Sequence, residues 1–281
     1  MRSLILNSPS RPVSSLKSIA FLCALCVLCG ENSSYAELPQ EIRVVTYNIH
    51  HGEGTDGKLD LERIAAVINA EKPDLVGLNE VDQGVRRSQG LDEPAELAKL
   101  TGMTHVFEKN IDHDGGKYGN AILSRLPIVR HENHKLPSHY KGEQRGVLEV
   151  EVGDSNDALL FLCTHLDYRP KDHERLASIE TIEKIAAASE GKPVILVGDL
   201  NAVPESEVMK AFAKSWGRSN SEPLATFPAG KPDRQIDYIQ FRPASEWEVV
   251  ETRVLDEPVA SDHRGMMAVL RKREGDKRQA D

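Results

Sequence analysis

Aromatic residues and positive charge are both scarce in this sequence. The 281 residues include 6 Phe, 6 Tyr and 2 Trp, and 35 Lys and Arg stand against 44 Asp and Glu. Proteins that bind single-stranded nucleic acid stack its bases on clustered aromatic rings, and proteins that bind duplex DNA neutralise its phosphates with basic patches. Nucleic acid is therefore possible as a partner but not favoured. With a net charge of −9, a protein that handles phosphate needs a metal ion to make its site locally positive.

Long hydrophobic runs are also absent, with one exception near the N-terminus. Residues 19–30 (IAFLCALCVLCG) follow a segment with three basic residues and precede the small-x-small sequence Ser34-Tyr35-Ala36. The run is shorter than the ~20 apolar residues that span a bilayer, and the arrangement is typical of a secretory signal peptide. We therefore expect residues 1–36 to be cleaved after Ala36, the protein to be exported to the periplasm or the extracellular space, and the mature chain to contain no transmembrane segment. An uncleaved N-terminal anchor is the alternative.

Cysteine is nearly absent from the predicted mature chain. Three of the four Cys lie within residues 1–36, so only Cys163 remains and no intramolecular disulfide can form. An exported domain without disulfides depends on its hydrophobic core, and about 245 residues are enough to build one. Cys163 lies in an apolar run, so we expect a buried structural thiol. Cleavage also removes three basic residues and one acidic residue, which leaves 32 against 43 and a net charge of −11.

The rest of the chain has an ordinary globular composition, with 40% hydrophobic and 28% charged residues overall. Short apolar runs rich in β-branched residues predict strands at Ile42–Tyr47, Asp74–Leu78, Ala121–Leu123, Gly146–Val152, Leu159–Thr164, Val194–Gly198, Ile236–Phe241, Val249–Val254 and Met266–Leu270. Helical periodicity appears at Leu61–Ala70, Asp172–Ala188 and Glu205–Ala213, and Asp60 is a suitable N-cap for the first helix. No internal repeat or long linker is visible. We expect a single α/β domain over residues 37–271 and a charged, flexible tail over residues 272–281.

Polar side chains follow several of these predicted strands. They are Asn48, Glu80, His165, Asp199 with Asn201, and Asp262 with His263. In α/β folds, functional sites assemble at the carboxyl ends of strands. These side chains are therefore the leading candidates for a single site.

Each candidate also has an ordinary structural explanation. Glu80 follows a buried strand and needs a partner, which is either a hard cation or a salt bridge. Asp199 and Asn201 suit the activation of water beside a phosphoryl group, but Asp-x-Asn also forms an Asx turn. Asp237 is an acid inside an apolar strand, for which a histidine is a natural partner. His165 taken alone is equally typical of a structural histidine.

The motifs taken together, in this order, resemble the endonuclease/exonuclease/phosphatase superfamily, which includes deoxyribonuclease I, AP endonucleases, inositol polyphosphate 5-phosphatases and neutral sphingomyelinases. The resemblance is carried by Tyr47-Asn48, Glu80, Tyr118 to Ser124, Thr164-His165-Leu166, Gly198-Asp199-Leu200-Asn201, Ile236-Asp237-Tyr238 and Ser261-Asp262-His263, and spans about residues 42–270. It implies an α/β fold of the deoxyribonuclease I type, a four-layer α/β/β/α sandwich with two packed mixed β-sheets. It also implies a site where both sheets present their strand ends.

The resemblance implies a role for each residue. Asn48 and Glu80 hold a divalent cation, Mg²⁺ or Mn²⁺, with Glu80 as the direct ligand. Asp199 orients or deprotonates the attacking water, Asn201 contacts the phosphoryl oxygens, and His263, oriented by Asp237, contacts the scissile phosphate. Asp262 supports the metal or polarises His165, which stabilises the transition state or protonates the leaving oxygen. The family leaves the general base open between an Asp and a His. Arg145 is a plausible phosphate-binding fork, and Tyr118 and Asn120 are expected to line the substrate cleft.

The sequence departs from the family pattern at two places. Asn79 stands before Glu80 where Gln is common, and His50 stands two residues after Asn48 where AP endonucleases carry an Asp. This puts an AP-endonuclease identity in doubt. His50, His51 and His113 lack the tight spacing of a zinc site, so the oxygen-rich strand ends favour magnesium or manganese.

The expected activity is metal-dependent hydrolysis of a phosphodiester, through attack of water on phosphorus. A sugar or inositol phosphomonoesterase, a secreted nuclease, a lipid-headgroup phosphodiesterase and an inert binding module are alternatives. Trp216 and Trp247 are isolated, which disfavours a membrane-inserting hairpin. The loop Thr226–Pro228, with Lys231 and Arg234, is a candidate part of the substrate pocket. We expect the protein to be monomeric.

Overall fold

The computed structural model describes residues 38–154 and 157–273. The predicted signal peptide with its cleavage site, and tail residues 274–281, lie outside the described residues. Within them, no helix combines the length and the apolar character needed to cross a membrane.

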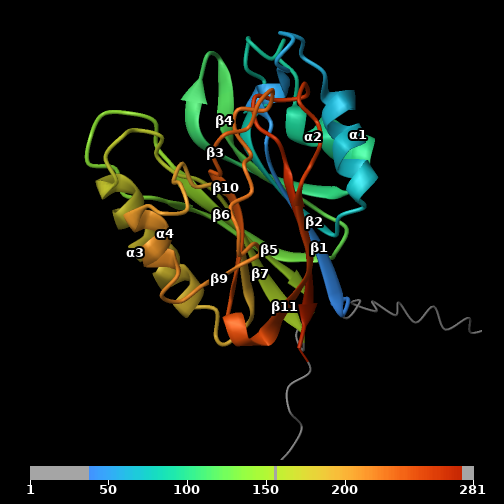
Figure 1. Ribbon diagram of the computed structural model, residues 1–281. Coiled ribbons are helices and arrows are strands. Elements are labelled where there is room, and N and C mark those ends of the chain that lie inside the picture. The colour runs from blue at the N-terminus through green and yellow to red at the C-terminus, as the bar shows by residue number, and fades with distance from the viewer. Residues whose placement is uncertain (1–37, 155–156, 274–281) are drawn as a thin grey trace, which may run out of the picture. The chain divides into compact units, whose positions relative to one another are not determined.

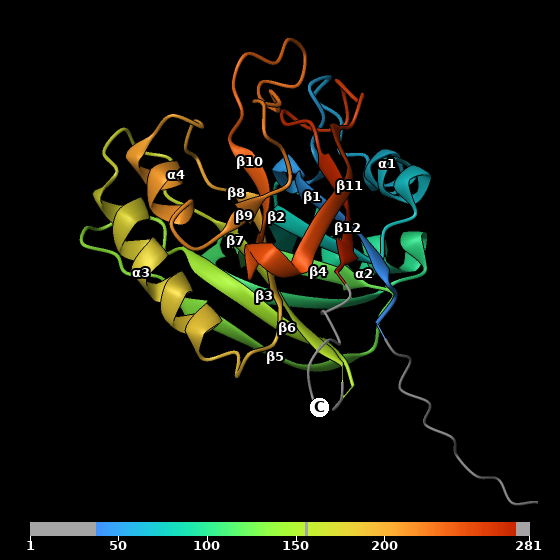
Figure 2. The same ribbon diagram turned by 60° about the horizontal axis from the view of Figure 1, so that its bottom comes forward.

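The described chain forms two six-stranded mixed sheets (Figures 1 and 2). The first sheet has the strand order β11-β12-β1-β2-β4-β3, with β1 (Glu41–Asn48), β2 (Leu75–Gln83), β3 (Thr104–His113), β4 (Gly116–Ser124), β11 (Trp247–Val254) and β12 (Met266–Lys272). The second has the order β5-β6-β7-β8-β10-β9, with β5 (Ile128–Lys135), β6 (Gly146–Gly153), β7 (Ala158–His165), β8 (Val194–Asp199), β9 (Gly217–Arg218) and β10 (Asp237–Arg242). Each sheet holds one parallel pair, β1 with β2 and β7 with β8, among antiparallel neighbours.

Helices cover the outer face of each sheet. Helices α1 (Leu61–Glu71) and α2 (Glu93–Thr101) lie on one side of the sandwich, and α3 (His173–Ala187) and α4 (Glu207–Phe212) lie on the other (Figure 1). Two short 3-10 helices, η1 (His50–Gly52) and η2 (Ala244–Glu246), complete the elements. The predicted four-layer α/β/β/α fold is confirmed.

The strand pattern explains the layers, because strand side chains alternate between two faces. On β1, Val44 faces the core between the two sheets, while Val45 and Tyr47 face the core beneath α1 and α2. A third core lies between the second sheet and its helices α3 and α4. Cys163 packs in the core between the sheets, where burial raises the pKa of its thiol, so the predicted structural role is confirmed.

Each predicted strand and helix is present in the structure, but α2, β3, β5 and β9 were not predicted. Strands β3, β5 and β9 are edge strands, and β3 and β5 are half-exposed and largely polar, so no apolar run marks them. Helix α2 carries a detectable signal, since Asp92 caps its N-terminus and Gly102 ends it in the left-handed conformation. Strand β12 runs to Lys272, one residue past the predicted domain boundary.

Candidate active site

The parallel pairs β1–β2 and β7–β8 end close to one another and bring the predicted strand-end residues together. In the register of each pair, Asn48 lies opposite Asn79 and His165 lies opposite Asp199. Asn48 and Asp199 then meet across the two sheets, with the side-chain nitrogen of Asn48 3.3 Å from Oδ2 of Asp199. The site therefore lies at the seam between the two sheets, as the resemblance implies.

Backbone irregularities aim two of these side chains. The pairing of β2 with β4 shifts register between Leu78 and Val81, and Glu80 in this bulge has a φ of 59°. Bulges of this kind redirect a side chain at the edge of a sheet. At Gly198 φ is 142°, and a Cβ there would lie 1.8 Å from the carbonyl oxygen of Thr164. Only glycine allows β8 to pass this close to β7 immediately before Asp199.

Asn79 joins the two sheets through hydrogen bonds beneath the site. Its side-chain nitrogen donates to Oδ1 of Asn120 at 2.9 Å and to the carbonyl of Thr164 at 3.0 Å, and its Oδ1 accepts from the backbone nitrogen of Asp199 at 2.9 Å. All four residues are buried. Buried polar groups of this kind hold a single arrangement because each broken bond leaves an unsatisfied partner.

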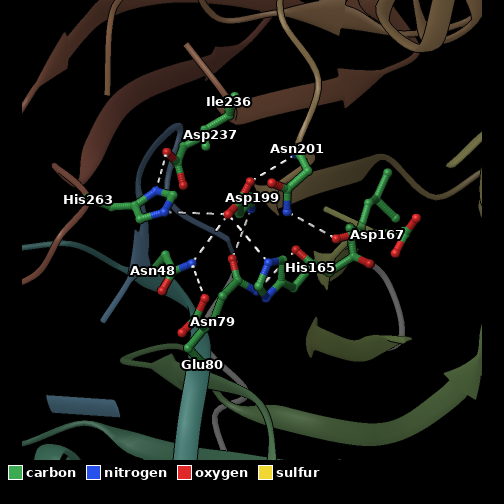
Figure 3. Close-up of polar contacts among 12 residues, drawn as sticks. Asn48, Asn79, Glu80, His165, Asp167, Asp199, Asn201, Ile236, Asp237 and His263 are labelled. Atoms are coloured by element: carbon green, nitrogen blue, oxygen red, sulfur yellow. Dashed lines mark hydrogen bonds and ion pairs between the residues drawn. The ribbon is translucent and has the colours of Figure 1, made fainter. Parts of the chain in front are cut away.

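Asp199 is the centre of the site, and the side chains around it point toward its carboxylate (Figure 3). Its Oδ1 accepts from the backbone nitrogen of Asn201 at 2.9 Å. Its Oδ2 lies 3.4 Å from Nε2 of His165 and 3.7 Å from Nε2 of His263. The side-chain nitrogen of Asn48 donates to this same oxygen and to Oε1 of Glu80 at 3.0 Å. A single carboxylate thus faces two imidazoles and an amide.

His263 and Asp237 form the expected buried pair. Nδ1 of His263 donates to Oδ2 of Asp237 at 2.9 Å, and Thr226 donates its hydroxyl to the same oxygen at 2.6 Å. Ser261 anchors the segment by donating to the carbonyl of Asn48 at 2.7 Å. With Nδ1 used by Asp237, Nε2 of His263 is the nitrogen that faces Asp199 and the cavity.

The charges in the site follow from burial and pairing. Burial on its own would lower the pKa of His263, but the charge and hydrogen bond of Asp237, with Asp199 and Asp262, outweigh it and raise this pKa to about 10. Burial raises the pKa of Asp199 to about 7, and the positive charge of His263 opposes that rise. At neutral pH His263 is therefore cationic, and Asp199 is a buried carboxylate poised to take up a proton.

His165 is neutral and its tautomer is fixed by Arg145. Burial is the main cause, and the positive charges of Arg145 and His263 are lesser causes, of a His165 pKa well below its usual range. Nη1 of Arg145 lies 3.0 Å from Nδ1 of His165 and 2.6 Å from a carboxylate oxygen of Glu143. Because guanidinium nitrogens only donate, Nδ1 of His165 accepts and its Nε2 carries the proton.

A cavity of about 480 Å³ opens above these groups. Its wall is formed by Glu80, Tyr118, Glu143, Arg145, His165, Tyr168, Asp199, Asn201, Val203, Phe227, Arg234, Ile236, Asp262 and His263. Tyr168 and Val203 are 66% and 41% exposed and form, with Phe227 and Ile236, an apolar part of this wall. Of the loop proposed for the pocket, Phe227 and Arg234 line the cavity, whereas Thr226 lies beneath it on Asp237.

Two groups of side chains among the described residues could hold a metal ion: His50, His51 and Glu80, and Asp199, Asp237 and His263. The second group already forms the Asp237–His263 hydrogen bond, so its charges are paired internally. The first group includes the half-exposed Glu80 at the cavity wall, which fits the carboxylate expected to hold the ion. His50 and His51 belong to this group although their spacing in the sequence is not that of a zinc site.

One predicted site residue, Asn120, does not lie where it was expected, and the metal-binding roles of Asn48 and Asp262 stay predictions. Asn120 is 1% exposed and does not line the cavity, because its amide bonds Asn79 and the carbonyl of Gly146. Asn48 turns its NH₂ group to Glu80, and its oxygen accepts from the backbone nitrogen of His50 at 3.1 Å, which leaves that oxygen one lone pair for a cation. Asp262 lines the cavity but belongs to neither metal-capable group in the described chain.

Asn79, Glu143 and Tyr168 had no predicted role in the site, and Thr226 was expected at the cavity wall rather than beneath it on Asp237. Asn79 and Thr226 act through buried hydrogen bonds to Asp199 and Asp237, which depend on contacts between distant segments. Glu143 and Tyr168 lie near Arg145 and His165 in the chain, and this proximity is the only signal the sequence holds for them.

Known proteins resemble this chain in sequence. The sequence model of the Endonuclease/Exonuclease/phosphatase family matches residues 45–263. Uncharacterized protein YbhP of Escherichia coli (strain K12) is 27% identical over 219 residues, which cover 72% of this chain and 85% of that protein. Nocturnin of Rattus norvegicus is 27% identical over 235 residues, which cover 73% of this chain and 54% of that protein.

Solved structures share the fold. The endonuclease/exonuclease/phosphatase from Beutenbergia cavernae DSM 12333 superposes with a TM-score of 0.67 at 26% identity, covering 83% of this chain and 72% of that one. A mannosyl-6-phosphatase from Bacteroides thetaiotaomicron VPI-5482 gives a TM-score of 0.67 at 19% identity and covers 82% of this chain and 99% of its own. At that identity the second likeness establishes the fold alone.

Proposed function

The chain belongs to the endonuclease/exonuclease/phosphatase family, a family of phosphoesterases, and on this premise we propose that it is a divalent-metal-dependent hydrolase of small organic phosphodiesters. The observation that carries the proposal is the meeting of Glu80, His165, Asp199, Asn201 and His263 at one cavity, with Asp237 behind His263. These groups supply a proton acceptor, a fixed positive charge and hydrogen-bond donors, which phosphoester hydrolysis requires.

Asp199 is the proton acceptor in the proposed mechanism. It is held by the backbone nitrogen of Asn201 and its pKa lies near neutrality, so it can orient water and take up a proton as the water attacks phosphorus. His263, kept cationic by Asp237, faces Oδ2 of Asp199 and is placed to neutralise charge on the phosphoryl oxygens.

His165 is placed to stabilise the leaving oxygen as a neutral donor. Its Nε2 carries the proton because Arg145 occupies Nδ1, and the low pKa argues against a charged general acid at neutral pH. Glu80 would hold the divalent cation at the cavity wall. When bound there, the cation supplies further positive charge to the phosphoryl oxygens.

The charge of the cavity supports a diester rather than a monoester. Four carboxylates line it, those of Glu80, Glu143, Asp199 and Asp262, against the cations Arg145, Arg234 and His263. A diester carries one negative charge at neutral pH and a monoester about two, so the diester meets less repulsion. The apolar wall formed by Tyr168, Val203, Phe227 and Ile236 supports an organic group on the substrate.

The test is hydrolysis of bis-p-nitrophenyl phosphate and of p-nitrophenyl phosphate by residues 37–281, with EDTA and then with added Mg²⁺, Mn²⁺ or Zn²⁺. We expect hydrolysis of the diester that stops in EDTA and returns with a divalent cation. Preference for the monoester would instead support a phosphatase. Lack of hydrolysis of either ester by folded protein with every cation would contradict the proposal.

We also propose that the protein is exported as a monomer after cleavage at Ala36. N-terminal sequencing of the protein from the medium and the periplasm tests the cleavage, and light scattering tests the oligomeric state. A mature N-terminus at Glu37 and a monomer mass are expected. An intact N-terminus on membrane-bound protein would contradict export by cleavage.

A further inference from the structure

A cluster of two histidines and one glutamate lies at the end of β1, beside the cavity. His50 and His51 belong to η1, and Glu80 belongs to the bulge of β2. One potential ligand atom from each residue lies within 4.8 Å of the other two. Glu80 lines the cavity, whereas the two histidines lie outside its lining.

The backbone turns sharply to place the two imidazoles together. His50, His51 and Gly52 have φ values of 46°, 44° and 77°, so three successive residues are left-handed. Their rings lie edge to face, with centroids 4.4 Å apart. A left-handed histidine is unfavourable, and such residues concentrate at sites that bind a ligand or carry out chemistry.

One ring nitrogen of His50 is hydrogen-bonded to the backbone, as is common for histidines that bind a metal through the other nitrogen. Nδ1 of His50 lies 3.1 Å from the carbonyl oxygen of Glu53. Because a carbonyl only accepts, Nδ1 carries the proton and Nε2 keeps its lone pair. Metal-binding histidines characteristically donate their other ring N–H to a carbonyl or carboxylate in this way.

His51 supplies an independent sign of a missing partner. Its side chain is 9% exposed, and its buried Nδ1 has no hydrogen-bond partner among residues 38–154 and 157–273. Buried polar atoms in native structures are nearly always satisfied. A cation bound between His51, His50 and Glu80 provides that partner.

We propose that Glu80, His50 and His51 together bind one divalent transition-metal ion, with the affinity order Zn²⁺, then Mn²⁺, then Mg²⁺. The proposal rests on the proposed function in that this ion is the one the hydrolase uses. Imidazole suits transition metals, whereas Mg²⁺ prefers oxygen ligands and water. Ligand bonds of about 2.0–2.2 Å require the three atoms to approach one another slightly, which side-chain rotation allows.

The test measures metal binding directly, without substrate. Isothermal titration of residues 37–281 with ZnCl₂, MnCl₂ or MgCl₂ is compared with titration of His50→Asn, His51→Asn and Glu80→Gln. Asparagine tolerates the left-handed conformation better than most residues, so these variants keep the turn. His131→Asn, on the exposed face of β5 in the other sheet, is the matched control.

We expect the wild-type protein to bind Mn²⁺ at least tenfold more tightly than Mg²⁺. Each histidine variant should weaken Mn²⁺ binding at least tenfold, Glu80→Gln should weaken all three metals, and His131→Asn should match the wild type. Circular dichroism of each variant confirms folding, and the half-exposed His50 gives a second reading if His51→Asn unfolds. Unchanged Mn²⁺ binding in His50→Asn, or equal affinity for Mn²⁺ and Mg²⁺, would overturn the proposal. Binding as expected without hydrolysis would instead refute the proposed function alone.

Discussion

Replacing Asp237 with asparagine should convert His263 from a cation into a neutral imidazole. Asparagine keeps the shape of the aspartate side chain and an oxygen that can accept from Nδ1 of His263, a hydrogen bond of 2.9 Å in the wild type. It removes the negative charge. The His263 pKa of about 10 lies 3.5 above the ordinary 6.5, which corresponds to ~5 kcal/mol in favour of the charged ring at ~1.4 kcal/mol per unit. Asp237 is the main source of this stabilisation, and burial works against it.

In Asp237→Asn only the charges of Asp199 and Asp262 still oppose the burial effect, so the His263 pKa should fall toward its ordinary value. We expect the turnover number for the diester to drop roughly 10²–10³-fold, the usual effect of removing one preorganised group. Histidine ring NMR between about pH 6 and pH 9 follows the titration directly. The wild-type His263 ring should keep both of its protons over this range, whereas the variant ring should lose one. Asp112→Asn, at an exposed site on β3, is the control.

Identical titration of His263 in the variant and the wild type, or a change in turnover number of less than threefold, would show that Asp237 does not keep His263 charged for the reaction.

Three further predictions concern the scaffold around the site. Gly198→Ala should lower the free energy of unfolding by ~1–3 kcal/mol and slow hydrolysis, because the new Cβ collides with the Thr164 carbonyl. The control is Gly230→Ala, where the new Cβ meets open space and thermal unfolding should show no such loss. Equal melting temperatures for the two variants would contradict the prediction. Asn79→Ala should lower the free energy of unfolding by roughly 1–3 kcal/mol, because buried partners in both sheets lose their hydrogen bonds. A change in urea midpoint too small to resolve would argue against a stabilising role for these bonds. Burial, with the charge of Asp82, raises the pKa of Glu93 to about 8, so its contribution to stability is full below pH ~4.5 and is lost as pH rises through about 8. The stability of Glu93→Gln relative to wild type should therefore grow by up to ~1.4 kcal/mol per pH unit across that range in urea titrations, and a pH-independent difference would count against it.

The central strands and the residues at their ends could be predicted because local sequence specifies both. Strands buried on two faces appear as apolar runs, and a polar residue directly after such a run is visible without any knowledge of packing. Asp199 and His165 were found in this way, whereas His263 lies in the segment before β12, and the resemblance supplied its role. The edge strands β3 and β5 escaped prediction because only one side of each has a neighbouring strand, so their sequences remain polar.

The contacts between the sheets could not be predicted from the sequence. The bond from Asn79 to Asp199 joins residues 120 positions apart and depends on how β2 packs against β8. Asn120 was assigned to the cleft because its place after a glycine loop does not reveal that both ends of its amide are occupied. The cluster of His50 and His51 with Glu80 depends on a left-handed turn that side-chain spacing does not indicate.

The most direct test of the account compares Asp199→Asn with Asp74→Asn in hydrolysis of bis-p-nitrophenyl phosphate under the metal that best supports the wild type. Asp199 lies at the centre of the site. Asp74 lies just before β2, at the end of that strand away from the site, and accepts from the backbone nitrogen of Arg43. Both substitutions remove one partly or fully buried carboxylate and keep the side-chain shape. We expect a loss of at least ~10²-fold in turnover for Asp199→Asn and less than threefold for Asp74→Asn, with both proteins folded. Equal turnover in the two variants would show that the reaction does not take place at this site.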